Sequence, residues 1–447
     1  MNFENIALHV PTILLPEQGT DMTKWAVVAC DQYTSQPEYW GKVKELTEDS
    51  TSTLNLILPE VYLESEGREQ MIRNINKNMK VYLEQGVLTA QKPGFILIDR
   101  KTSHAQSRKG LVIALDLEQY DYKEGSRTLI RSTEGTILDR LPPRIKVREQ
   151  AAIELPHIMV LIDDPEKTVI EPLFEKHLER IYNFKLMMQS GHIKGYMVDD
   201  ENIIRETADN LARLANRETF SKKYSVTDKD VLLYAVGDGN HSFASAKAIW
   251  EELKKSAENK KEVMNHPARY ALVELVNVHD EGLTFEPIHR VVFNIDAEEM
   301  LKQMESFYTQ QGSGFSCRRF ETLEELQNES KKLQQENTHL VLFITEKNFG
   351  VLTVKNPKFN LGAGTLQSFL DDYLKDMKDA KIDYIHGADI VTGLGSKPGN
   401  IGFYLPVISK HDLFKTIILE GTLLRKTFSM GKADEKRFYL ECRRITV

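Results

Sequence analysis

The residues best suited to chemistry lie in one short segment, GDGNHS, at positions 237–242. It contains Gly237, Asp238, Gly239, Asn240, His241 and Ser242. The glycines permit backbone angles that a side chain would disfavour, so amide groups can approach a ligand closely. His241 and Ser242 can donate hydrogen bonds to an anion, while the oxygens of Asp238 and Asn240 suit Mg²⁺. The segment fits a phosphate- or nucleotide-binding loop, and a helix-capping turn explains the same residues equally well.

The flanking segments place this loop between a strand and a helix. Residues 231–236 (VLLYAV) form an apolar run that predicts a buried strand. Residues 241–255 carry apolar side chains on one face and charged ones on the other, which predicts an amphipathic helix. That helix would direct the positive end of its dipole at the loop, where an anion is favoured. The chain has no GxxxxGK[ST] motif, so an ordinary P-loop is excluded.

A second polar group follows a short predicted strand at 128–131. Arg131 offers a fixed cation, Glu134 a general base or metal ligand, and Thr136 a hydroxyl. A solvated turn is the commoner meaning of such a pattern. Pro142 and Pro143 follow and argue against a helix running through this region.

Two basic groups in the second half of the chain could hold an anion. His289 and Arg290 precede the apolar residues 291–293 and so lie at the entrance to a predicted strand. Arginine offers a planar fork to phosphate or carboxylate and histidine a switchable donor, although a surface ion pair explains the two equally well. Lys426 belongs to a stretch rich in cations and hydroxyls, 425–432, for which a solvated basic turn is the commoner explanation.

The overall pattern predicts an α/β (α+β) protein with mixed sheets and flanking helices. The run 25–30 (WAVVAC) predicts a buried strand, followed by a polar loop at 31–37 of the kind that often holds function. Apolar periodicity predicts a helix at 68–85, and two apolar runs predict a hairpin of 94–99 with 110–117. Further helices are expected at 199–216, 297–308, 322–335 and 366–377, and further strands at 157–162, 270–278, 340–345, 349–354, 382–385 and 402–407.

Length and composition limit the class of protein. We expect a main α/β domain at 1–300 carrying the GDGNHS loop and a smaller C-terminal α/β region at 301–447. The formal net charge of -8 argues against a surface that binds duplex nucleic acid. The chain shows no signal peptide and no run approaching the ~20 apolar residues that span a bilayer. Three cysteines without a CxxC pair fit a reducing compartment. We therefore expect a cytoplasmic protein with a small-molecule substrate, no nucleic-acid or membrane partner, and a homodimer as the assembly to consider.

Four short blocks occur in the same order as in the family called domain of unknown function 1015, which the chain resembles. Residues 238–242 resemble a DGHHR-like loop and residues 131–136 an RPHEKT-like element. Residues 288–290 resemble a THR-like element and residues 425–429 a KSTYF-like element. The chain departs from the family pattern at Asn240, Ser242 and Thr133, where an arginine or histidine would have supplied a further donor.

The resemblance implies a fold and a chemistry. The family is similar to the ParB and sulfiredoxin-like group, whose Gly-His-Arg loop binds nucleotide phosphates and some of whose members are free-serine kinases. It thus implies a ParB/sulfiredoxin-like nucleotide-loop core and Mg²⁺-dependent phosphoryl transfer from ATP or ADP to a small hydroxyl-bearing metabolite such as free serine. A nucleotide-binding regulatory protein of ParB-like type, without turnover, is the alternative. The implied roles are catalytic for Glu134, Asp238 and His241; nucleotide- or phosphate-binding for Gly237, Gly239, Asn240, Ser242, Arg131, His289, Arg290 and Lys426; and metal-binding for Asp238 and Asn240.

Overall fold

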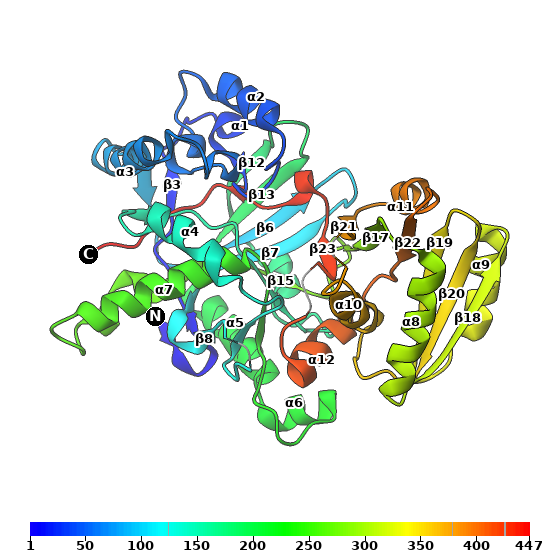
Figure 1. Ribbon diagram of the computed structural model, residues 1–447. Coiled ribbons are helices and arrows are strands. Elements are labelled where there is room, and N and C mark those ends of the chain that lie inside the picture. The colour runs from blue at the N-terminus through cyan, green and yellow to red at the C-terminus, as the bar shows by residue number, and fades with distance from the viewer. Residues whose placement is uncertain (124, 378, 424–425) are drawn as a thin grey trace. The chain divides into compact units, whose positions relative to one another are not determined.

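The structure, a computed structural model, describes residues 1–123, 125–377, 379–423 and 426–447 (Figure 1). It divides into two compact units. Unit 1 consists of Met1–Thr284 together with Met430–Val447, and unit 2 of Phe285–Ser429. This division differs from the expected 1–300 and 301–447, because the last segment of the chain returns to unit 1. No helix among the described residues is long and apolar enough to cross a membrane.

Unit 1 is built on an 11-stranded mixed sheet. Its main path runs β12 (Glu179–Lys185), β13 (His192–Val198), β6 (Phe95–Lys101), β7 (Arg108–Asp116), β15 (Tyr270–Asn277), β11 (Met159–Ile162), β14 (Tyr234–Asp238), β9 (Ile130–Ser132) and β8 (Tyr120–Asp121). Strands β11 and β15 run parallel, as do β14 and β9, whereas β6 and β7 form the expected antiparallel pair. The α/β fold class with mixed sheets is therefore confirmed.

Both faces of this sheet are covered, which explains the unbroken apolar runs of its central strands. Alternate residues of β6 point to opposite cores: Ile96 and Ile98 to one, Phe95 and Leu97 to the other. Helix α3 (Arg68–Glu84) packs on the first face, as its periodicity predicted. Helices α5 (Glu201–Leu214) and α7 (Asn240–Ser256) pack on the second.

The segment Met430–Val447, here called the C-terminal strap, is fastened into unit 1 by short strands and buried charges. Its strand β24 (Phe438–Tyr439) pairs with β4 (Val27–Val28), and β25 (Arg443–Arg444) pairs with β10 (Ile153–Glu154). Directly before β24, the buried Arg437 guanidinium binds the carboxylates of Glu274 and Glu441. The strap is the red segment inside unit 1 in Figure 1.

Unit 2 holds a six-stranded antiparallel sheet of its own. The order is β18 (Gly314–Phe320), β20 (Phe349–Lys355), β19 (Thr338–Thr345), β22 (Asn400–Tyr404), β17 (His289–Phe293) and β21 (Lys381–Ile385). Helices α8 (Ala297–Gln310) and α10 (Gly362–Tyr373) pack on one face, and α11 (Ala388–Gly395) on the other. The unit also contains α9 (Leu323–Leu333) and α12 (Lys410–Glu420).

Three local expectations need correction. Helix α4 spans Leu141–Arg148 although Pro142 and Pro143 argued against a helix, because both prolines lie in its first turn, where no amide donor is required. Strand β14 begins only at Tyr234, and the carbonyl of Val231 instead accepts a hydrogen bond from Arg131. The run 25–30 contributes only the two-residue strand β4, since Trp25 ends helix α1 (Met22–Trp25).

Candidate functional site

The GDGNHS loop joins the end of β14 to the start of α7. Gly239 has φ +77, and a Cβ there would lie 3.0 Å from the Cα of Ile158. Both observations favour glycine, because other residues rarely adopt this angle and a Cβ would press against the backbone of Ile158. The N-cap residue of α7 is Gly239 itself, which has no side chain to cap the helix. Its first amide groups thus point into the site with the positive end of the helix dipole.

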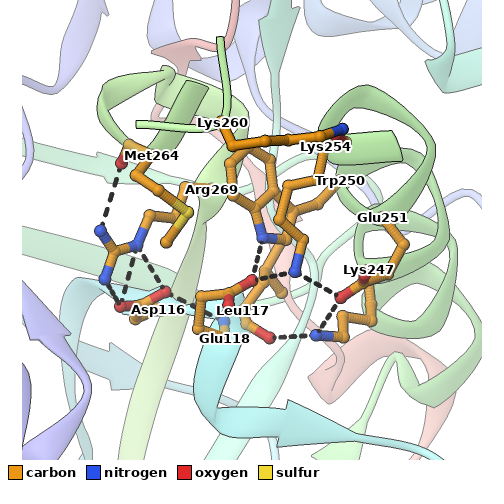
Figure 2. Close-up of polar contacts among 10 residues, drawn as sticks. All are labelled: Asp116, Leu117, Glu118, Lys247, Trp250, Glu251, Lys254, Lys260, Met264 and Arg269. Carbon is orange, nitrogen blue, oxygen red and sulfur yellow. Dashed lines mark hydrogen bonds and ion pairs between the residues drawn. The ribbon is translucent and has the colours of Figure 1, made fainter. Parts of the chain in front are cut away.

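Helix α7 is held rigidly along the turns that follow. Figure 2 shows Trp250 and Lys254 both donating hydrogen bonds to the carboxylate of Glu118. Lys247 donates to the carbonyl of Leu117 at 2.8 Å. These contacts fix α7 to the segment that follows β7, so its N-terminus has a defined position relative to the sheet.

Asp238 is engaged by a cation from the C-terminal strap. Its Oδ2 lies 2.9 Å from the Nζ of Lys436, and its Oδ1 accepts a hydrogen bond of 3.1 Å from the amide of Gly239. Both groups are largely buried, which strengthens their attraction. Lys436 therefore brings a positive charge to the loop that the local sequence did not reveal.

Asn240 connects the loop to the segment after β9. Its Nδ2 donates to the Oγ1 of Thr133 at 3.4 Å, and Thr133 donates to the carbonyl of Val236 at 2.7 Å. The structure thus brings the 131–136 segment next to the loop, with the half-buried Glu134 directly after Thr133. Two buried oxygens here, Asn240 Oδ1 and Thr136 Oγ1, have no hydrogen-bond partner among the residues that the structure describes.

His241 is a neutral imidazole in this setting. Its Nε2 accepts a hydrogen bond of 3.4 Å from the amide of Ile137. Burial, followed by the charges of Arg144 and Arg140, lowers the pKa of His241 to about 4. At neutral pH the ring carries no charge, and its Nδ1–H remains a hydrogen-bond donor.

Ser242 contacts a histidine that sequence reasoning did not identify. Its Oγ lies 3.1 Å from the Nε2 of the buried His157, and the Nδ1 of His157 lies 2.6 Å from the hydroxyl of Tyr439. Asp31 Oδ2 is 3.9 Å from the same Nε2. The only earlier signal was for Asp31, the first residue of the polar loop expected to hold function. No role was assigned from the sequence to His157, Lys436 or Tyr439.

The electrostatic balance keeps Asp31 ionised. Burial alone would raise the pKa of Asp31, but the charge of His157 when it is protonated, a hydrogen bond from Gln32 and the charge of Lys436 outweigh burial and hold that pKa below its ordinary value. Asp31 and Asp238 thus share the influence of one lysine. No group of three or more His, Cys, Asp or Glu side chains suited to a metal ion exists among the described residues.

Arg131 is not directed at the loop. Its Nε donates to the carbonyl of Thr128 at 2.8 Å, and its Nη2 donates to the carbonyls of Asp230 at 2.8 Å and Val231 at 3.2 Å. These acceptors precede β9 and β14, whereas the loop follows β14. Burial lowers the pKa of Arg131 to about 10, which leaves it charged at neutral pH.

The other expected cations belong to unit 2. Arg290 is fully buried, where its Nε donates to Gln367 at 3.1 Å and its guanidinium carbon lies 4.8 Å from the centre of the Tyr384 ring. His289 Nδ1 accepts a hydrogen bond of 3.0 Å from the amide of Leu405, and burial lowers its pKa. Lys426 is exposed, and Arg425 lies outside the described residues.

Comparison with known proteins gives distant structural neighbours. A conserved hypothetical protein from Pyrococcus furiosus is 11% identical, with 75% of this chain and 95% of that chain covered and a TM-score of 0.35. A free serine kinase in complex with AMP is 9% identical over 78% and 95% of the two chains, with a TM-score of 0.37. SbnI with a C-terminal truncation, from Staphylococcus aureus, is 9% identical over 72% and 82%, with a TM-score of 0.33. These values are too low to transfer residue roles, so the site rests on the geometry of this chain.

Sequence comparison is more decisive about the family. No curated protein matches the chain. The family model described as protein of unknown function (DUF1015) matches residues 14–373, which is most of the sequence. The chain therefore belongs to the DUF1015 family.

Proposed function

We propose that this protein binds the phosphates of a nucleotide, ATP or ADP, at the N-terminus of α7 and transfers a phosphoryl group to a small hydroxyl-bearing metabolite such as free serine. The observation that carries the proposal is the first turn of a 17-residue helix whose N-cap residue, Gly239, has a positive φ and no side chain to cap it. Exposed amide groups and the helix dipole together make such a terminus an anion site.

The neighbouring side chains suit phosphate more than a metal ion. The amides at 240–242 and the Nδ1–H of His241 can donate to phosphate oxygens, and Lys436 adds a positive charge close by. The carboxylate of Asp238 is already neutralised by Lys436 and bonded to the Gly239 amide. It is thus a poor magnesium ligand as it stands, and no step is assigned to a metal.

The acceptor hydroxyl would lie beside the loop, where a base is at hand. Glu134 follows Thr133, which contacts Asn240. Asp31 is another carboxylate near the loop, 3.9 Å from the ring of His157. Either carboxylate can receive the proton of an acceptor hydroxyl, as general-base catalysis requires.

A regulatory protein that binds nucleotide without turnover is the second candidate. It is favoured because two arginines expected to bind the nucleotide phosphates are engaged by other groups of the protein. Arg131 is occupied by three backbone carbonyls, and Arg290 is buried within unit 2. Phosphoryl transfer relies strongly on such cations, whereas ground-state binding needs fewer.

Thermal unfolding with a panel of nucleotides, with and without Mg²⁺, tests the binding step. A ligand at 100 times its dissociation constant stabilises the folded state by about 2.7 kcal/mol, which raises the melting temperature. We expect this rise to be lost in His241→Ala and Lys436→Met and kept in Lys432→Met, an exposed lysine in the same strap. No rise with any nucleotide would refute the proposed site.

Product analysis then separates the two candidates. Wild-type protein is incubated with ATP or ADP and a panel of hydroxy amino acids, and phosphorylated products are measured by mass spectrometry. A phosphorylated amino acid supports the kinase. A nucleotide-dependent rise in melting temperature without product supports the regulatory protein.

A further inference from the structure

Four polar groups form a continuous line from the interior of unit 1 to the first turn of α7. The Tyr439 hydroxyl lies 3.0 Å from Cys30 Sγ and 2.6 Å from His157 Nδ1. On the other side of the ring, His157 Nε2 lies 3.1 Å from Ser242 Oγ. A hydroxyl bonded to an imidazole that is itself oriented by a third group is the arrangement of an activated nucleophile.

The hydrogen-bond pattern indicates the protonation state of the ring. The Tyr439 hydroxyl donates to Cys30 Sγ, and its oxygen also accepts from the Cys30 amide at 3.4 Å. Its remaining lone pair can then accept from His157 Nδ1–H. This tautomer, assigned from the network, leaves the lone pair of Nε2 directed at the Ser242 hydroxyl.

Two surrounding features favour proton removal from Ser242. The Asp31 carboxylate, 3.9 Å from Nε2, would stabilise the positive charge that His157 gains. Ser242 lies in the first turn of α7, where the helix dipole stabilises negative charge on an attacking oxygen or on an attached phosphoryl group. Ser242 is only half-buried, so a ligand at the loop can reach it.

We propose that Ser242 is itself a phosphoryl acceptor, with His157 as its general base and Tyr439 as the residue that positions the ring. Ser242 Oγ attacks the terminal phosphorus of the bound nucleotide while its proton passes to His157 Nε2. The new Oγ–P bond forms as the bond from that phosphorus to its bridging oxygen breaks, and the nucleotide leaves one phosphoryl group shorter. This step rests on the proposed nucleotide site, and it adds a covalent modification of the chain to that proposal.

Peptide mapping by mass spectrometry after incubation with ATP or ADP and Mg²⁺ tests the transfer. We expect one phosphoryl group on the peptide that contains Ser242, absent in Ser242→Ala and in His157→Gln. Ser245→Ala is the matched control, because Ser245 lies on the same helix but donates its hydroxyl to the His241 carbonyl at 2.8 Å. If nucleotide raises the melting temperature yet the peptide stays unmodified, the acceptor role of Ser242 is overturned while the nucleotide site stands.

A fluorophosphonate probe tests the nucleophile without any nucleotide. The Ser242 oxygen displaces fluoride from phosphorus and His157 takes the proton, so labelling should occur at Ser242 and slow by about 10²-fold or more in His157→Gln. In Tyr439→Phe, labelling should slow and the midpoint of its pH–rate curve should move, which a loss of packing alone would not cause. Absence of labelling at Ser242, or an equal labelling rate in His157→Gln, overturns the inference. This outcome does not depend on whether the loop binds a nucleotide, because the probe reacts without one.

Discussion

Replacing Arg437 by methionine should destabilise unit 1 by about 3–5 kcal/mol, the usual cost of breaking a buried ion pair by removing one partner. The Arg437 side chain is 2% exposed and binds two carboxylates, Glu274 at 2% and Glu441 at 0% exposure. Its Nε also donates to the carbonyl of Pro156 at 3.1 Å. The variant would leave two negative charges buried side by side without their shared cation.

The carboxylates, rather than lost packing, should dominate this cost. Arg437→Met combined with Glu274→Gln and Glu441→Gln removes the uncompensated charge and should recover most of the lost stability. Burial favours a neutral Glu274, yet Arg437, followed by Arg108, holds the pKa of that carboxyl below its ordinary value. Without Arg437 this pKa rises, so the folded variant takes up a proton as the pH falls. The difference between Arg437→Met and wild type should therefore shrink between pH 7 and pH 5.

Urea unfolding followed by tryptophan fluorescence measures this effect in the relevant unit. All three tryptophans, Trp25, Trp40 and Trp250, are buried and lie in unit 1. If Arg437→Met lowers the free energy of unfolding by less than about 1 kcal/mol, far less than breaking a buried ion pair normally does, the reasoning is refuted. A triple variant no more stable than the single one would refute it equally.

Two further predictions concern the loop. Gly239→Ala should lower the urea midpoint more than Gly125→Ala. Both glycines have φ +77, but only at Gly239 would a Cβ contact the backbone, 3.0 Å from Ile158 Cα. Equal decreases in the midpoint would show that this close contact is unimportant. The pKa of His241 falls from 6.5 unfolded to about 4 folded, so the unfolded state binds more protons between these values and stability declines as pH falls from 6.5 to 4. His241→Gln should show a smaller decline over this range in urea titrations, and an unchanged pH dependence would contradict the assignment.

Much of the local structure could be predicted because it depends on neighbours in the sequence. The helix at Arg68–Glu84 and the pairing of β6 with β7 follow from apolar spacing alone. The strand, loop and helix around residues 237–242 were also expected, apart from the late start of β14. The ordered family blocks identified the DUF1015 family without any coordinates.

The composition of the site depended on the tertiary structure. Asp31, His157 and Ser242 meet because strand order brings distant segments together, and periodicity within one segment carries no information about strand order. Lys436 and Tyr439 reach the loop only because buried charges and two short strand pairings fasten the C-terminal strap to unit 1. Conversely, Arg131 was expected to bind nucleotide phosphate, but its guanidinium donates to carbonyls that precede β9 and β14. Residue type and spacing thus located a candidate anion-binding loop, whereas the side chains that face it were decided by long-range packing.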